Sequence, residues 1–424
     1  MRILQRHAGH HEYLETVVDE ALSDAALSPA DRGLVHEITC GVVRWQATLD
    51  WLIARKTAGR AQKAVLQILL RLGLYQMFWL DRVPDHAVVH ETVDLAKRLG
   101  FGAQAGFINA VLRGCLRERE QTEKLLAELK QTQPALGYSH PEWLCARWER
   151  TWGRDHLKQL LEWNNTPPAA YGRRNALKAD VAALTAAWST EGVRFAPHLC
   201  DWAGGGLVFR LESHPPLATL PSFQQGLFYV QDPSTLLAVS ELDPKPGETV
   251  LDLCAAPGGK TTFIAQVMQN RGRIVAQDHQ PGRLKLVREN CDRLGVSCVE
   301  TEPAPTPSPL APRPSPFDRV LVDAPCSNTG VLRRRVDLRW RIRPEEIERL
   351  RIMQLELLRQ AVRHLKPAGT LVYSTCSLEP EENRGVIDAF LKEQPQMQLV
   401  SERQLLPFVD GVDGAYVARL AQAG

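Results

Sequence analysis

The spacing of apolar residues divides the chain into three regions, and the first, residues 1–125, has the spacing of helices. Ser28 and Pro29 stand where a helix cap and a first helical residue are preferred. The apolar side chains that follow recur at helical intervals: Leu34, Ile38, Val42, Trp45, Leu49 and Leu52. Residues 63–80 are apolar on most faces, which predicts a buried helix, and residues 84–100 predict another that ends at a glycine. The first region is therefore expected to be an all-α bundle.

The second region, residues 126–235, has a mixed pattern. Leu144, Trp148 and Trp152 share one stripe of a predicted helix, and "AAYGRRN" and "GLVFRLE" have the composition of short strands between turns. A small α+β domain is expected. Arg173 and Arg174 form a basic edge, for which contact with a phosphate and simple solvation are equally good interpretations.

From residue 236 onward, short apolar runs alternate with helical stretches. The runs are "ETVLDLC", "RIVAQD", "DRVLVD" and "GTLVYST", and they lack the alternation of half-exposed strands. Such strands, joined by helices, are typical of a parallel sheet covered on both faces, which predicts an α/β doubly wound domain. Residues 303–316 contain seven prolines and predict an extended loop.

Composition narrows the classes of protein to which the chain can belong. The chain of 424 residues is 44% hydrophobic and 24% charged, as expected of a folded protein with several domains. A net charge of +2 neither requires nor excludes a nucleic-acid partner, so any such surface must come from local clustering. The N-terminus is too charged for a signal peptide, and no apolar run reaches the ~18–20 residues of a membrane span. We expect a soluble cytoplasmic protein.

The nine cysteines show no CxxC or Cys/His ligand spacing, which disfavours structural zinc and a disulfide framework. His86 and His90 lie four residues apart on a predicted helix, but no third ligand is near them in the sequence. No metal is expected.

The stretch "LDLCAAPGGKTT" follows the first strand of the third region and leads into a helix. Pro257, Gly258 and Gly259 would bring the backbone and the amides of a helix N-terminus close to a ligand. A phosphate loop of the form G-x-x-x-x-G-K-[ST] would need glycine at position 254, where this chain has Cys254. A nucleoside-cofactor loop would need an acidic residue about 20 positions on, at the end of the second strand, and Asp278 meets that requirement. The second interpretation is favoured.

Two further strands end in cysteine-containing motifs, "VDAPCSNTG" with Asp323 and Cys326, and "YSTCSLEPEEN" with Cys376. The carboxyl ends of parallel strands form the ligand-binding edge of such a sheet. A single cysteine there could be packing alone, but two beside a cofactor loop predict chemistry. The remaining cysteines are expected to pack in the interior: Cys40, Cys115, Cys145, Cys200, Cys254, Cys291 and Cys298.

Thiols beside a nucleoside-type cofactor suit methylation of a pyrimidine, because carbon 5 of that ring is a poor nucleophile. Addition of a thiolate to carbon 6 would let carbon 5 attack an electrophilic methyl group, with a carboxyl group assisting at N3. A base would then remove the proton from carbon 5, and the thiolate would leave. The motifs alone leave open whether Cys326 or Cys376 is the nucleophile.

These motifs, together with "SPADRGLVHEITCGVVRW", "AGFINAVLR" and the closing "DGVDGAYVARL", resemble the bacterial Fmu/Sun (RsmB-type) 16S ribosomal RNA cytosine-5 methyltransferases over nearly the whole chain. The resemblance implies a NusB-like helical RNA-binding domain at 1–125 and an RRM-like α+β domain at 126–235. It implies a Rossmann-like class I S-adenosylmethionine methyltransferase domain at 236–424. Methylation of carbon 5 of a cytidine in 16S ribosomal RNA, with S-adenosyl-L-methionine as cofactor, is the implied activity, and a monomer is expected.

The resemblance also implies roles for single residues. Cys376 would be the nucleophile, Cys326 would assist release of the product, and Asp323 would face both cofactor and cytosine. Family members usually carry an aspartate after the third strand for the adenine side of the cofactor, where this chain offers only Glu302 or Glu300. The implied cofactor-binding residues are Cys254, Ala255, Ala256, Pro257, Gly258, Gly259, Lys260, Asp278, Glu302 and Asp323.

The stretch "GVLRRRVDLRWRIRPEE" follows Cys326 and gathers arginines around one tryptophan, a composition suited to phosphates and unpaired bases. A solvated basic loop is the alternative. The predicted RNA-binding residues are Arg333, Arg334, Arg335, Arg339 and Trp340. The target cytidine should be single-stranded or flipped out. A non-catalytic RNA-binding factor with the same fold, and a P-loop nucleotidase, are the competing functions.

Overall fold

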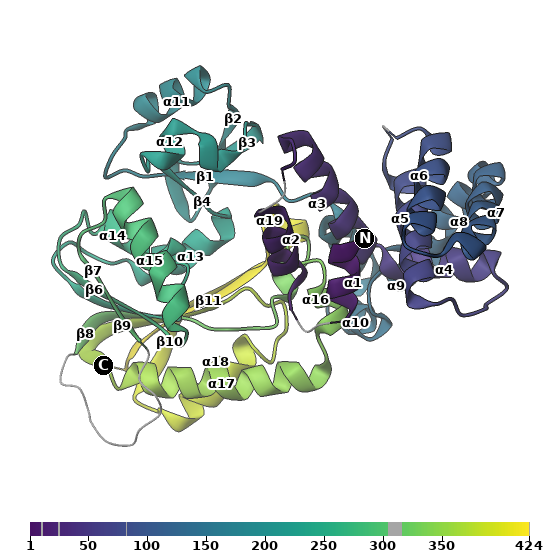
Figure 1. Cartoon of the computed structure of the whole chain (residues 1–424). Coiled ribbons are helices and arrows are strands. Elements are labelled where there is room, and N and C mark those ends of the chain that lie inside the picture. Colours follow the sequence, from purple (N-terminus) through teal and green to yellow (C-terminus); the bar gives the residue numbers. More distant parts are fainter. Residues whose placement is uncertain (10–11, 24–25, 82, 304–315, 424) are drawn as a thin grey trace. The chain divides into compact units, whose positions relative to one another are not determined.

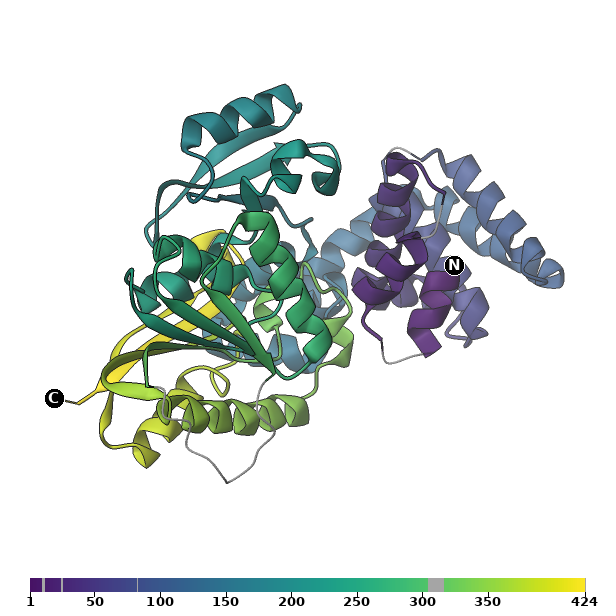
Figure 2. The same cartoon turned by 60° about the vertical axis from the view of Figure 1, so that its left-hand side comes forward.

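The computed structural model describes the chain except residues 10–11, 24–25, 82, 304–315 and 424 (Figures 1 and 2). Most of the predicted proline-rich loop thus lies outside the described residues. The chain divides into two compact units. Met1–Pro167 and Leu332–Arg341 form the helical unit, and Pro168–Val331 and Ile342–Gly424 form the α/β unit.

The helical unit confirms the predicted all-α character of the first region. Its elements are α1 (Arg2–Gly9), α2 (Leu14–Ser23), α3 (Pro29–Arg44), α4 (Gln46–Lys56), α5 (Ala64–Trp79), α6 (Asp85–Arg98), η1 (Gly102–Gln104), α7 (Ala105–Arg117), α8 (Arg119–Thr132), α9 (Pro134–Gly137), α10 (Glu142–Asn165) and α16 (Leu338–Arg341). Ser28 caps α3 by accepting a hydrogen bond from the amide of Asp31 at 3.1 Å. The apolar pattern predicted one helix through Leu52, but the chain breaks at Trp45 between α3 and α4.

The core of the helical unit is built around α5, whose side chains are buried on most sides, as predicted. The same core includes Val336 and the partly buried Trp340, which lie about 250 residues later in the chain. Residues 332–341 therefore fold as part of the helical unit, although the sequence places them inside the predicted catalytic domain.

The first part of the α/β unit is a four-stranded antiparallel sheet with the order β2-β3-β1-β4. Its elements are β1 (Ala170–Arg174), α11 (Val181–Thr190), β2 (Arg194–Cys200), β3 (Ala203–Ser213), η2 (Leu217–Thr219), α12 (Pro221–Gln224) and β4 (Phe228–Val230). Trp188 packs its ring against Phe209 and Phe228 with centroids 5.4 and 5.2 Å apart, which anchors α11 on the sheet. The α+β character predicted for the second region holds for residues 168–235, whereas residues 126–167 of that region belong to the helical unit.

The rest of the α/β unit is a seven-stranded sheet with the order β10-β11-β9-β8-β5-β6-β7. Its elements are η3 (Pro233–Leu236), α13 (Leu237–Leu242), β5 (Thr249–Leu253), α14 (Gly259–Val267), β6 (Arg273–Asp278), α15 (Pro281–Leu294), β7 (Val299–Pro303), β8 (Phe317–Asp323), η4 (Thr329–Val331), α17 (Pro344–Val362), β9 (Leu365–Thr375), α18 (Arg384–Glu393), β10 (Met397–Leu405), α19 (Pro407–Asp410) and β11 (Ala415–Gln422).

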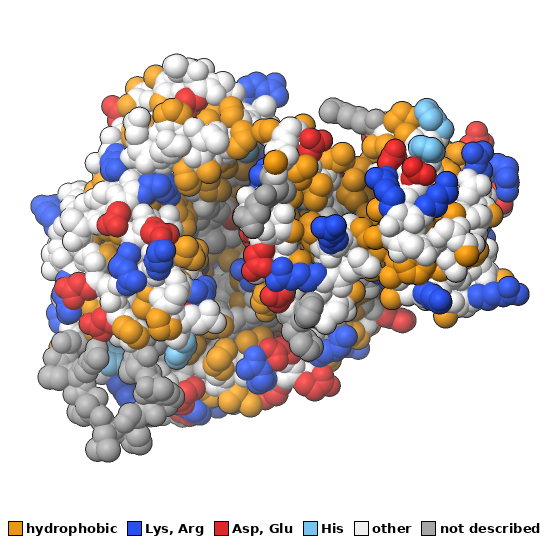
Figure 3. Space-filling model, viewed as in Figure 1, with side chains coloured by type: hydrophobic (Ala, Val, Ile, Leu, Met, Phe, Trp, Pro, Cys, Tyr) orange, Lys and Arg blue, Asp and Glu red, His pale blue; other side chains and the backbone are white. Residues whose placement is uncertain are grey.

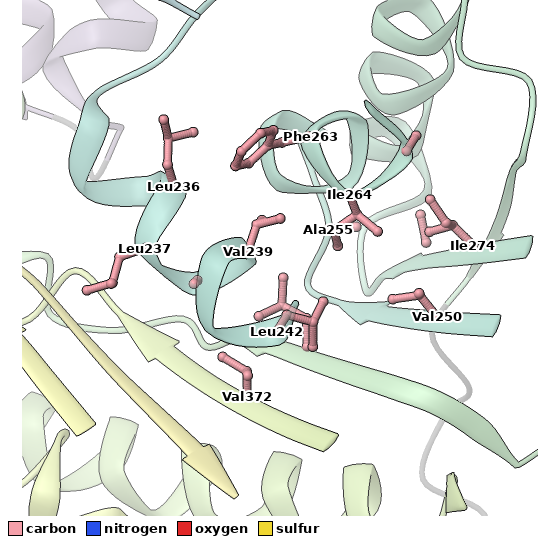
Figure 4. Packing of buried hydrophobic residues seen from close by; sticks show 14 of the residues in the cluster. Leu236, Leu237, Val239, Leu242, Val250, Ala255, Phe263, Ile264, Ile274 and Val372 are labelled. Atoms are coloured by element: carbon pink, nitrogen blue, oxygen red, sulfur yellow. The ribbon is translucent and has the colours of Figure 1, made fainter. Parts of the chain in front are cut away.

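Helices cover both faces of this sheet, which confirms the predicted doubly wound domain. α13, α14 and α15 lie on one face, and α17 and α18 on the other (Figure 1). Figure 4 shows how Val239 and Leu242 of α13 meet Ile264 of α14 above the strands. The five neighbouring strands β5 to β9 pair in parallel, but β11 pairs antiparallel with both β9 and β10, so the sheet is mixed and not wholly parallel as predicted.

Acidic and basic side chains are interspersed on the face shown in Figure 3, in keeping with the small net charge. Among the described residues, no helix combines the length and the apolar character needed to cross a membrane. Nor do those residues contain a group of three or more His, Cys, Asp or Glu side chains arranged to hold a metal ion.

Candidate active site

The glycine loop connects the end of β5 to the start of α14 and has an irregular backbone. Cys254 has φ +63° and Gly258, the cap of α14, has φ +101°. A Cβ on Gly258 would lie 3.2 Å from the Cα of Val287, so only glycine fits both the conformation and the space. The loop thus leaves backbone and helix N-terminal amides at the carboxyl edge of the sheet, as the sequence predicted.

Asp278 ends β6 beside this loop, where the sequence placed it. Its buried carboxylate accepts hydrogen bonds from the amide of Ala256 at 3.3 Å and from the amide of Gln280 at 3.0 Å. Arg283 also donates to Asp278, at 3.2 Å, and donates to the backbone oxygen of Ala256 at 2.8 Å. Arg283 belongs to no predicted motif; its place in the first turn of the helix after Asp278 is the signal that could have identified it.

A second carboxylate, Asp252, lies beneath the loop and was also missed. It is completely buried, and its Oδ2 accepts a hydrogen bond from Thr261 Oγ1 at 2.6 Å. Burial raises the pKa of Asp252 to about 7, with the Thr261 hydrogen bond acting in the opposite direction. Asp252 ties the start of α14 to β5 and has no surface for a ligand.

Lys260, in the first turn of α14, pairs with Asp323 at the end of β8. Its Nζ lies 2.6 Å from Asp323 Oδ2, and Ser374 Oγ donates to the other carboxylate oxygen at 2.8 Å. Burial lowers the pKa of Lys260, but the charge of Asp323 and its hydrogen bond outweigh burial and leave that pKa raised. The sequence did not identify the partner of Lys260; the structure pairs it with Asp323.

The two cysteines of the strand-end motifs meet at this edge. Their Sγ atoms are 3.3 Å apart, and the Cys376 thiol donates to Asn328 Oδ1 at 3.0 Å. Cys326 is buried, whereas Cys376 is partly exposed. The hydrogen bond with Cys376, together with burial, raises the pKa of the Cys326 thiol well above its ordinary value. Cys326 is therefore held as a neutral thiol directly beside a more accessible sulfur.

Two glycines bring a third segment, the closing "DGVDGAY" motif, against the cysteines. The amide of Gly330 donates to the backbone oxygen of Cys376 at 2.9 Å, and the amide of Gly414 donates to the backbone oxygen of Gly330 at 2.9 Å. A Cβ on Gly330 would lie 2.7 Å from the Gly414 oxygen and 2.8 Å from the Cys376 oxygen. The close approach of the three segments thus requires glycine.

The two acidic candidates after the third strand lie on β7. Glu302 pairs in register with Gln277, one position before Asp278, and accepts a hydrogen bond from Gln277 Nε2 at 3.4 Å. Glu300 lies further from the carboxyl edge and forms an ion pair with Arg273 at 2.7 Å. Of the two, Glu302 lies nearer the Asp278 end of the sheet, and its contact with an adenine stays a prediction.

Of the predicted basic edge, Arg173 is buried and Arg174 is only partly exposed. Arg173 is buried and donates to the backbone oxygen of Gly259 at 2.7 Å and to Thr262 Oγ1 at 3.1 Å. Burial lowers the pKa of Arg173 to about 9. Arg174 donates to the backbone oxygens of Gly206 and Ala179 at 3.0 and 2.8 Å. The phosphate interpretation is therefore wrong for Arg173, which instead holds the first turn of α14.

The predicted RNA-binding set requires a similar correction. Arg333 and Arg339 are buried, with 4% and 0% of their surface exposed. The Arg333 guanidinium stacks 3.9 Å from the Trp163 ring centre, and Arg339 donates to the backbone oxygens of Ser139 and Asn164 at 3.2 and 3.0 Å. Both side chains hold the helical unit together and expose almost no surface, which disfavours the predicted contact with RNA.

The remaining predicted RNA-binding residues, Trp340, Arg334 and Arg335, are not fully buried. Trp340 is partly buried and its indole N–H donates to the backbone oxygen of Val43 at 2.7 Å, which commits it to the helical unit. Arg334 and Arg335 are exposed, so contact of these two residues with RNA stays a prediction.

Comparisons with known proteins agree with this architecture. Residues 239–421 match the family described as 16S rRNA methyltransferase RsmB/F, residues 1–117 match the NusB family, and residues 140–209 match the RsmF/B-like, ferredoxin-like domain.

Individual relatives extend the similarity to nearly the whole chain. The "Probable ribosomal RNA small subunit methyltransferase B" of Bacillus subtilis is 34% identical, over 97% of this chain and 95% of the relative. The "Ribosomal RNA small subunit methyltransferase B" of Klebsiella pneumoniae is 37% identical, over 93% and 91%. A crystal structure of a methyltransferase homolog protein from Pyrococcus horikoshii is 31% identical, with a TM-score of 0.59, and covers 68% of this chain and 97% of its own.

Proposed function

Because this chain belongs to the 16S rRNA methyltransferase RsmB/F family, we propose that it methylates carbon 5 of a cytidine in 16S ribosomal RNA, with S-adenosyl-L-methionine as methyl donor. The observation that carries the proposal is the pair of thiols 3.3 Å apart at the ends of adjacent parallel strands, beside the glycine loop. Neither a P-loop nucleotidase nor a purely RNA-binding factor would need two thiols in contact at this edge.

The residues of the glycine loop fit the proposed methyl donor. Cys254 and Gly258 have positive φ angles, and a Cβ at position 258 would lie 3.2 Å from the Cα of Val287 on α15, so glycine lets the loop pack close to that helix. Backbone groups of residues 254–260 would hold the methionine and ribose side, and the Asp278 carboxylate would accept hydrogen bonds from ribose hydroxyls. Glu302 would lie towards the adenine. When bound, the cofactor supplies an electrophilic methyl group on a sulfonium.

Cys376 is the nucleophile in this proposal, because its thiol is the more exposed of the two. As the thiolate, its sulfur would form a bond to carbon 6 of the cytosine, and the electron pair displaced onto carbon 5 could then take the methyl group as the bond between methyl and sulfonium breaks. Asp323, held between Lys260 and Ser374, would assist the ring at N3, with Lys260 as the source of a proton. In this proposal, Cys376 activates the base at carbon 6, and Asp323 and Lys260 orient it at N3.

Release of the product requires a base that takes the proton from carbon 5, and the bond between sulfur and carbon 6 then breaks with its electron pair returning to sulfur. The Cys326 thiol lies next to the Cys376 sulfur and, with its raised pKa, is protonated at neutral pH. It can therefore donate a hydrogen bond or a proton to the departing thiolate. Cys326 accordingly acts in the second half of the reaction, and the cytidine must be unpaired or flipped out to reach both thiols.

Bisulfite sequencing of 16S ribosomal RNA from cells lacking this protein tests the proposal. We expect one 5-methylcytosine to disappear and to return when the wild-type gene is supplied. A Cys376→Ala gene should fail to restore it. An unchanged methylation pattern in the deletion strain would exclude this function and favour the non-catalytic RNA-binding factor.

A further inference from the structure

Glu382 is a buried carboxylate with no predicted role. It lies in the "LEPEEN" stretch between Cys376 and α18 and has 0% of its surface exposed. In the part of the chain that the structure describes, no basic side chain forms an ion pair with it. The hydrogen-bond donors around Glu382 must therefore compensate for its burial on their own.

Those donors come from both cysteine motifs. From the Cys326 motif, the Ser327 amide donates to Glu382 Oε1 at 2.9 Å, and Ser327 Oγ donates to Oε2. From the Cys376 motif, Ser377 Oγ donates to Oε2 at 2.5 Å. Each serine directly follows a cysteine, and the two hydroxyl groups are 3.0 Å apart. One carboxylate thus joins the residues next to both sulfurs.

A third element completes the arrangement. Gln354 of α17 donates through Nε2 to Glu382 Oε1 and to the backbone oxygen of Pro325, both at 2.9 Å. Pro325 precedes Cys326, so the Cys326 motif is held on both sides of its cysteine. On the other side of Glu382, its backbone oxygen accepts a hydrogen bond from the buried Tyr373 hydroxyl at 2.6 Å. The carboxylate is fixed by the sheet and by α17.

We propose that Glu382 is a positioning residue for the methyl transfer: its carboxylate holds the two cysteine motifs together so that both sulfurs reach the same cytosine. The inference rests on the proposed function, because the distance between the sulfurs matters only if both act on one base. A carboxylate without a counter-ion is a costly way to fill a core, and an apolar or amide side chain of the same size would serve packing alone. Hydrogen bonds to a charged acceptor are about twice as strong as neutral ones, which suits rigid alignment of two loops.

The charge has a second effect at the same site. The pKa of Cys326 is raised first by the hydrogen bond with Cys376, then by burial and by the charge of Cys376. The negative charge of Glu382 raises it further. Glu382 therefore also favours the neutral thiol that the release step uses. Both effects act through the cysteines and not through contact with RNA or cofactor.

The test compares Glu382→Gln and Glu382→Ala with the wild-type full-length protein. Glu381→Gln is the matched control, because it neutralises the adjacent, less buried glutamate. Two readouts are used: kcat and KM for methylation of 16S ribosomal RNA, and the rate at which diamide oxidises Cys326 and Cys376 to a disulfide, followed by mass spectrometry. In the second assay the two thiols lose their protons and two electrons, and diamide is reduced to the hydrazine. Because the Glu382 charge also affects the pKa of Cys326, rates are compared at equal thiolate content, taken from their pH dependence; they then report the approach of the sulfurs without requiring methyl transfer.

We expect both Glu382 variants to lower kcat about tenfold to hundredfold, as loss of a charged hydrogen-bond partner does, with KM for cofactor and RNA nearly unchanged. Disulfide formation should slow in parallel, and Glu381→Gln should match the wild type in both assays. Wild-type kcat and disulfide rates in folded Glu382→Gln would overturn the inference. So would a loss of kcat that merely follows a loss of folded protein or of cofactor binding. If the wild type itself does not methylate RNA, the proposed function fails instead.

Discussion

The buried carboxylate beneath the glycine loop makes a prediction about pH and stability. Asp252 is fully buried, has one hydrogen bond from Thr261, and has a pKa raised from 3.8 to about 7 by burial. A group whose pKa is higher in the folded than in the unfolded chain contributes stability below the unfolded pKa and loses it as the pH rises through the folded pKa. For Asp252, stability should therefore fall between about pH 4 and pH 7.

The size of the effect follows from the two pKa values. A rise from 3.8 to about 7 is equivalent to up to about 4 kcal/mol, at about 1.4 kcal/mol for each pH unit. Asp252→Asn keeps the shape of the protonated side chain and removes the titration. The variant should therefore lose this part of the pH dependence, and its advantage over the wild type should grow as the pH rises.

Thermal unfolding followed by dye fluorescence at pH 5 and pH 8 measures this difference. For a unit of about 250 residues, 1 kcal/mol corresponds to about 2–4 °C in Tm. The Tm of Asp252→Asn minus the Tm of the wild type should therefore be at least about 5 °C larger at pH 8 than at pH 5. The control is Asp318→Asn. Burial would raise the pKa of Asp318, but hydrogen bonds from Lys366 and Thr249 outweigh burial and lower that pKa to about 2. Asp318 is therefore charged at both pH values. Its replacement should change Tm equally at both. Parallel pH profiles for Asp252→Asn and wild type would refute the argument.

Two further predictions concern close packing and RNA contact. Gly330→Ala should lower kcat at least about tenfold, because its Cβ would lie 2.7 and 2.8 Å from the backbone oxygens of Gly414 and Cys376. Gly106→Ala, whose Cβ would have nothing within 4 Å, should leave kcat unchanged. Equal kcat values in the two variants would contradict this. Replacing both Arg334 and Arg335 by alanine should weaken the salt dependence of binding to 16S ribosomal RNA. The slope of the logarithm of the binding constant against the logarithm of the salt concentration should become smaller in magnitude by about 1.5. Arg339→Met should lower Tm without changing that slope; the opposite result would show that the buried guanidinium, not the exposed pair, meets RNA.

The fold and the cofactor edge follow from local features of the sequence. The glycine loop, Asp278, Asp323 and the two cysteines all stand at the ends of strands that are recognisable from their own apolar residues. In a parallel sheet, strand ends share one edge, so a local pattern is enough to bring these residues together. Asp252 is a carboxylate inside the apolar run of β5, but nothing in that run indicates that its partner is Thr261 of α14, nine positions later.

The arginine-rich stretch shows where local pattern fails. A run of arginines beside a tryptophan has the composition of an RNA-binding loop, yet Arg333 and Arg339 are buried against α10 and neighbouring backbone oxygens of the helical unit. The partners of Arg339 lie as much as 295 residues away in sequence, and nothing in the stretch itself indicates which guanidinium meets them. Glu382 is similar, because its role depends on Ser327, 55 positions earlier.

The division of labour between Cys376 and Cys326 is the central claim, and trapping the covalent RNA adduct on a denaturing gel tests it most directly. The wild type, Cys376→Ala and Cys326→Ala proteins are incubated with 16S ribosomal RNA and S-adenosyl-L-methionine, and the protein–RNA band is quantified. Cys376→Ala should give no adduct and no methylation, while Cys326→Ala should accumulate the adduct that it cannot release. Absence of adduct in Cys326→Ala, together with methylation by Cys376→Ala, would contradict the assignment and reverse the two roles.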